Sequence, residues 1–220
     1  GKTVEVTGLR AHRGSLLLRL VADCARHAEK GSCLPSYLLD AIGGAMERPA
    51  WRVGALRLLE AVVRAASWAV ASNAKSLCQS LIRQPPSAEL YDVLTALEET
   101  LGASSHVHAH LAIVFNSLKH PLPAEYADEA ARLLETVITR SGSLVDPAVL
   151  SCVCSAVCAT ALRYRAQPAT TLVYGRLVAA LLSHGNDTVP VPVHIARSLI
   201  ASMGPCAERT RLQLMADTAC

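Results

Sequence analysis

Prolines at a nearly fixed spacing are the feature that most constrains how this chain can fold. Pro49, Pro85 and Pro121 follow one another at intervals of 36 residues, and Pro168 and Pro205 continue the series at intervals of 47 and 37. Proline lacks an amide donor and disfavours helical geometry in the residue before it, so it marks helix boundaries. A period between about 20 and 50 residues is typical of repeat arrays. The spacing therefore predicts repeated units of 36–37 residues.

Each interval between prolines contains two segments whose apolar residues recur at helical spacing. The predicted first helices of five pairs start near Ser15, Pro49, Ser87, Pro123 and Pro168, and the second helices follow Pro35, Asn73, Ser105, Asp146 and Asp187. Ser15, Ser87 and Asp146 are suitable N-caps, and Pro147 suits a first helical position. Extra residues at 140–145 account for most of the 47-residue interval.

These patterns predict an all-α fold. We expect an α-solenoid of about five helix-turn-helix repeats of 36–37 residues, with a terminal helix after Pro205. Residues 1–14 are expected to form an extended N-terminal arm, and residues 15–220 a single helical-repeat domain. Because only 4% of residues are Phe, Trp or Tyr, the core is expected to consist of Leu, Ala and Val.

The composition also bears on the environment of the chain. The longest uncharged apolar stretch, 144–162, contains Asp146, Ser151 and Thr160, which favours a buried helix over a membrane span. Most of the eight cysteines lie in apolar helical segments rather than in loops. This placement favours small buried side chains in a reducing compartment over a disulfide scaffold.

Charge is divided unevenly along the chain. Residues 1–86 carry a net charge of +6, residues 87–150 carry −6 and residues 151–220 carry +3, which indicates different neighbours for these regions. Arg19 and Arg26, and Arg57 and Arg64, share a spacing of seven residues on the first helices of repeats one and two. In stacked repeats they would form a basic stripe able to contact RNA phosphates. The alternative is a solvated face on which the aliphatic part of each arginine lies against neighbouring side chains.

Two clusters of metal-binding residue types were weighed. On a helix Cys154 and Cys158 share a face and Cys152 points elsewhere, which favours packing over a four-ligand zinc site. His106 and His110 would lie one helical turn apart, with no third ligand evident. We therefore expect neither cluster to bind a metal and expect no other cofactor.

The acidic residues of the middle region were considered as a paired-carboxylate site. They have no nucleophile, glycine-rich loop or cofactor motif beside them, so a solvated acidic face is the favoured interpretation. The residues concerned are Glu98, Glu99, Glu125, Asp128, Glu129 and Glu135. No catalytic residues are predicted, and the protein is not expected to be an enzyme or to take a small-molecule substrate.

The period and the proline punctuation resemble those of the tetratricopeptide, pentatricopeptide and heptatricopeptide repeat families, over about 15–219. The interval of 36–37 residues is most similar to the heptatricopeptide type. That resemblance implies an RNA-associated structural or assembly role in an organellar ribonucleoprotein, such as a mitochondrial ribosome or RNA-processing complex. The alternative is a scaffold that binds a partner helix or peptide without contacting nucleic acid, in the cytoplasm or another reducing compartment. Both readings place the chain among protein partners, and neither involves a membrane.

Overall fold

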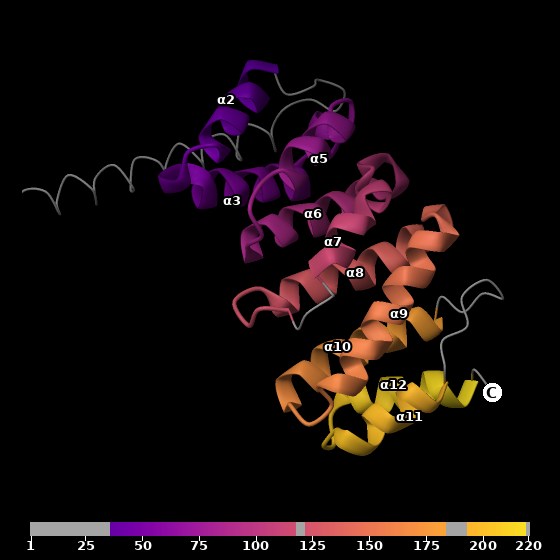
Figure 1. Ribbon diagram of the computed structural model, residues 1–220. Coiled ribbons are helices and arrows are strands. Elements are labelled where there is room, and N and C mark those ends of the chain that lie inside the picture. The colour runs from indigo at the N-terminus through magenta and orange to yellow at the C-terminus, as the bar shows by residue number, and fades with distance from the viewer. Residues whose placement is uncertain (1–35, 118–121, 184–192, 219–220) are drawn as a thin grey trace, which may run out of the picture.

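The computed structural model describes residues 36–117, 122–183 and 193–218, and within these ranges the chain is helical with no strand (Figure 1). The α-helices are α2 (Ser36–Met46), α3 (Pro49–Ala65), α4 (Trp68–Ala71), α5 (Ala74–Ile82), α6 (Ala88–Leu101), α7 (Leu111–Ser117), α8 (Ala127–Ser141), α9 (Pro147–Arg163), α10 (Pro168–Ser183), α11 (Val193–Ser202) and α12 (Ala207–Thr218). Short 3-10 helices are η1 (Gly102–Ser105), η2 (Val107–His110) and η3 (Gly142–Leu144). The all-α prediction is confirmed for these residues. The predicted arm at 1–14 and the helix after Ser15 lie outside them.

The predicted helix starts are set by capping and by proline. The hydroxyl of Ser87 accepts a hydrogen bond from the amide of Leu90 at 3.3 Å, and the carboxylate of Asp146 accepts one from the amide of Ala148 at 2.7 Å. α3, α9 and α10 each begin with a proline. The missing amide is harmless there because the first amides of a helix have no intrahelical acceptor.

Two connections differ from the expectation. The second helix of the third repeat starts only at Leu111, because Gly102 and His106 have φ angles of 52° and 60°, which interrupt a right-handed helix. η1 and η2 fill the interval. The extra residues at 140–145 do not form a loop, because Arg140 and Ser141 extend α8 and η3 covers the next three residues.

The helices pack in succession along the chain. α3 packs on α6, α6 on α8, α8 on α10 and α10 on α12, and we call these five the first helices. On the other side α7 packs on α9 and α9 on α11. In Figure 1 the first helices follow one another from α3 at the top to α12 at the bottom.

The core runs through the whole described part of the chain as one cluster, from Ile42 to Ala216. Leu56, Leu97 and Leu133 are fully buried in it, as the predicted Leu-rich core requires. Each such side chain contributes about 1.5–3 kcal/mol on burial. Among the described residues, no helix is both long and apolar enough to cross a bilayer.

Candidate interaction surface

One side of the first helices carries most of their charged side chains, and we call it the first-helix face. Its members recur at spacings of three, four or seven residues within a helix, which places them on one side. They are Arg57, Glu60 and Arg64 of α3, Glu89, Asp92 and Glu99 of α6, Asp128, Arg132 and Glu135 of α8, Arg176 of α10 and Arg211 of α12.

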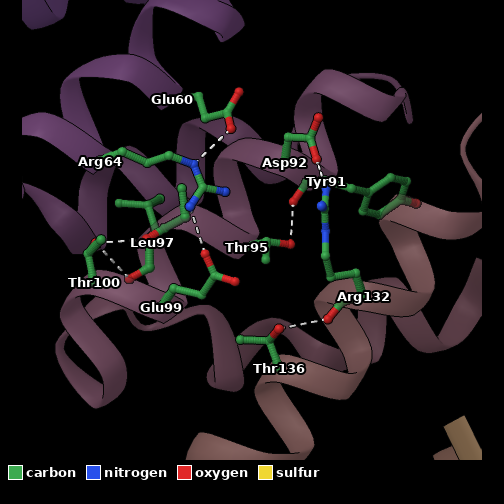
Figure 2. Close-up of polar contacts among 11 residues, drawn as sticks. Glu60, Arg64, Tyr91, Asp92, Thr95, Leu97, Glu99, Thr100, Arg132 and Thr136 are labelled. Atoms are coloured by element: carbon green, nitrogen blue, oxygen red, sulfur yellow. Dashed lines mark hydrogen bonds and ion pairs between the residues drawn. The ribbon is translucent and has the colours of Figure 1, made fainter. Parts of the chain in front are cut away.

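Arginines of α3 bridge to carboxylates of α6. Arg57 Nη2 lies 3.1 Å from Glu89 Oε1. Arg64 donates from Nε to Glu60 at 2.9 Å and from Nη1 to Glu99 at 2.8 Å, as Figure 2 shows. The hydrogen bond to Glu60, followed by that to Glu99, raises the pKa of the Arg64 guanidinium. The positive charge of Arg64 is therefore already balanced within the protein.

The next pair in the row joins α6 to α8. The carboxylate of Asp92 accepts a hydrogen bond from the guanidinium of Arg132 (Figure 2). Burial raises the pKa of the Asp92 carboxyl, and Arg132 opposes this only in part, because Glu60 and Glu129 also raise the pKa. Asp92 is thus a partly buried carboxylate whose neighbours include charges of both signs.

A single carboxylate of α8 connects the last three first helices. Glu135 accepts hydrogen bonds from Arg176 of α10 at 3.4 Å and from Arg211 of α12 at 2.5 Å, and we call this group the Glu135 clasp. α10 packs between α8 and α12. Since adjacent helix axes lie about 8–10 Å apart, Arg211 and Glu135 meet because both long side chains extend past α10 along the first-helix face.

The predicted arginine stripe is described only in part. Arg19 and Arg26 lie outside the described residues. The side chains of Arg57 and Arg64 are 69% and 43% exposed, so both reach solvent. Each nevertheless contacts a carboxylate that would repel a phosphate at the same place. Contact with RNA at these positions stays a prediction.

The expectation of a solvated acidic face is wrong at Glu98, which is completely buried. Its carboxylate accepts hydrogen bonds from the hydroxyl of Ser105 at 2.5 Å and from the hydroxyl of Ser141. The Ser105 oxygen in turn accepts the amide of Val107 at 3.1 Å. This network ties α6 to η1 and to the end of α8. The signal in the sequence was that Glu98 follows Leu94 by four residues and so shares its buried side.

The histidine and cysteine clusters contain no metal centre in the described part of the chain. His106 has left-handed backbone geometry, so it does not share an α-helical turn with His110. Burial, and then His106 and His108, lower the pKa of His110. Cys154 and Cys158 are buried and Cys152 is exposed, as the helical spacing predicted. Within the described ranges, no three His, Cys, Asp or Glu residues are close enough to hold a metal ion.

Comparisons with known proteins give no relative. No family model matches the chain, and neither a curated protein nor a solved structure does.

Proposed function

We propose that the chain is a non-catalytic α-solenoid that works as a scaffold for a protein partner. The 36–37-residue proline interval and the successive packing of α3, α6, α8, α10 and α12 support stacked two-helix units in which each unit contacts its neighbours. Such arrays act through extended curved surfaces rather than through a catalytic pocket. The Glu135 clasp, which links α8 to α10 and α12, fits this architecture.

The observation that carries the choice of a protein partner is the internal pairing of the first-helix face. Arg57, Arg64, Arg132, Arg176 and Arg211 all contact carboxylates of the same chain. A nucleic-acid surface gains affinity from cations that release counterions from phosphates. Guanidiniums already neutralised by Glu or Asp supply less of that affinity. A surface of alternating charge is better matched by a protein surface of mixed charge.

The second candidate is an RNA-associated structural or assembly component of an organellar, mitochondrial ribonucleoprotein such as a ribosome or RNA-processing complex. The net charge of +6 over residues 1–86 favours it, as does the 69% exposure of the Arg57 side chain. The resemblance to the heptatricopeptide type points the same way. In this candidate Arg19, Arg26, Arg57 and Arg64 contact RNA phosphates.

The two candidates differ in what nuclease does to the complex. We would capture partners of the intact tagged protein from cells with and without RNase, purify the main partner and titrate it with the purified protein by calorimetry. A scaffold retains its partner after RNase and binds it directly with defined stoichiometry. If every co-purified protein is released by RNase and none binds the purified chain, the scaffold proposal is wrong.

A further inference from the structure

A groove lies between α7 and α9, on the side of the second helices. Its volume is about 220 Å³, and its walls come from residues 108–112 and 144–149. Leu144 and Val149 supply apolar surface, and Ala109 and Ala112 leave room because their side chains are small. The Leu144 side chain at the rim is 53% exposed, although it is a large apolar residue. This groove is separate from the paired charges of the first-helix face.

The size of the groove limits what can occupy it. Sites for small-molecule ligands usually measure about 300–1,000 Å³, whereas a cavity of about 150 Å³ accommodates benzene. A volume of about 220 Å³ therefore suits one large side chain rather than a cofactor or a metabolite. Pockets filled by one such anchor are typical centres of protein–protein interfaces.

The charge at the groove indicates which kind of partner side chain can bind there. The carboxylate of Asp146 lines the groove and accepts the amide of Ala148 at 2.7 Å, and no cation of the described residues pairs with it. An arginine suits both the apolar lining and this carboxylate, because its stem can cover Leu144 and Val149 while its guanidinium reaches Asp146.

We propose that the α7–α9 groove, with Asp146 at its rim, binds an arginine side chain of a protein partner. The inference rests on the proposed scaffold function and specifies where one anchor of the partner docks. Arginine is favoured over lysine because its guanidinium is more weakly hydrated and pairs with carboxylates in a fixed geometry. It is also among the residue types enriched at the energetic centres of interfaces.

The test uses capped tripeptides, Ala-Arg-Ala, Ala-Lys-Ala and Ala-citrulline-Ala, titrated into the intact protein and followed by two-dimensional NMR. The proposal predicts saturable amide shifts at 108–112 and 144–149, with arginine strongest and uncharged citrulline weakest. Asp146→Asn should weaken arginine binding by about two- to fivefold, the range expected for an exposed ion pair. Asparagine caps helices as well as aspartate, so α9 should stay intact.

Three further variants separate loss of the site from general effects. Ala112→Leu, on α7, should abolish the amide shifts by filling the groove. Ala159→Leu, at an exposed alanine of α9, should leave the shifts unchanged. Glu125→Gln removes an exposed carboxylate elsewhere and should not alter binding.

Three results would contradict the proposal that the groove binds arginine. They are amide shifts outside the groove, equal amide shifts from all three peptides, or arginine binding by Asp146→Asn as strong as that of the wild-type protein. These results leave the scaffold proposal standing, because that proposal depends on the nuclease and calorimetry result. Conversely, the scaffold proposal can fail while the tripeptide still binds in the groove.

Discussion

Glu98 shows how one buried carboxylate can be held by hydroxyl groups alone in the described structure. Ser105 and Ser141 donate to its two oxygens from separate segments, so the network fixes η1 and the end of α8 against α6. Removing one donor leaves a buried carboxyl oxygen of Glu98 without a partner, which costs more than the loss of an exposed hydrogen bond.

We therefore expect Ser141→Ala to lower the free energy of unfolding by about 1–3 kcal/mol, the range for leaving a buried acceptor without its hydrogen bond. Ser143→Ala, at an exposed residue two positions along, should change it by less than about 0.5 kcal/mol. Denaturant titrations of the three proteins measure the difference. Equal stabilities of both variants would mean that the hydroxyl of Ser141 does not support Glu98.

At the residue scale, the cysteines differ in how exposed and how reactive their thiols are. Burial, with a smaller contribution from Glu98, raises the pKa of the Cys78 thiol to about 12, whereas Cys152 is exposed on α9. Because the thiolate is the reactive form, Cys78 should stay protonated and unlabelled by iodoacetamide from pH 7 to pH 9, while Cys152 is alkylated. Peptide mapping by mass spectrometry gives both rates. Similar rates at the two positions in the folded protein would contradict the buried placement of Cys78.

At the scale of elements, proline and the capping residues make helix starts predictable. Pro49, Ser87, Asp146 and Pro168 act locally, so their effect can be predicted without knowing the tertiary structure. The left-handed backbone at His106 was not predictable, because a histidine carries no such local signal. The arginine pairs were missed for a related reason, since they depend on which helices become neighbours.

The Glu135 clasp gives a prediction at this scale. Glu135→Gln removes the charge that holds Arg176 and Arg211, so the row of first helices should open. We expect a larger radius of gyration by small-angle X-ray scattering and a stability loss of about 1 kcal/mol, the upper range for exposed pairs. Glu125→Gln is the matched control.

Salt supplies an independent check on the clasp. At 1 M salt the Debye length falls to about 3 Å, close to the 3.4 Å between Arg176 and Glu135, so salt should weaken the clasp only in part and should expand the wild-type protein less than Glu135→Gln does. An unchanged radius of gyration, both in the variant and at high salt, would show that curvature does not depend on these ion pairs.

At the scale of the whole molecule, one core joins all the described helices while polar contacts differ from side to side. The first-helix face is closed by internal ion pairs, and the groove between α7 and α9 is open. The helical character of the described residues could be predicted from the sequence because it depends on periodicity. The groove could not, because it arises from the spacing between two helices distant in the chain.

The central claim is that pairing within the first-helix face directs the protein toward protein partners rather than RNA. Fluorescence anisotropy of a labelled structureless RNA, titrated with the intact protein at physiological salt, tests it most directly. We expect binding weaker than about 10⁻⁴ M, the weak limit of non-specific nucleic-acid binding, and no change in Arg57→Gln/Arg64→Gln. Micromolar binding that falls steeply with salt and is weakened in that double variant would contradict it.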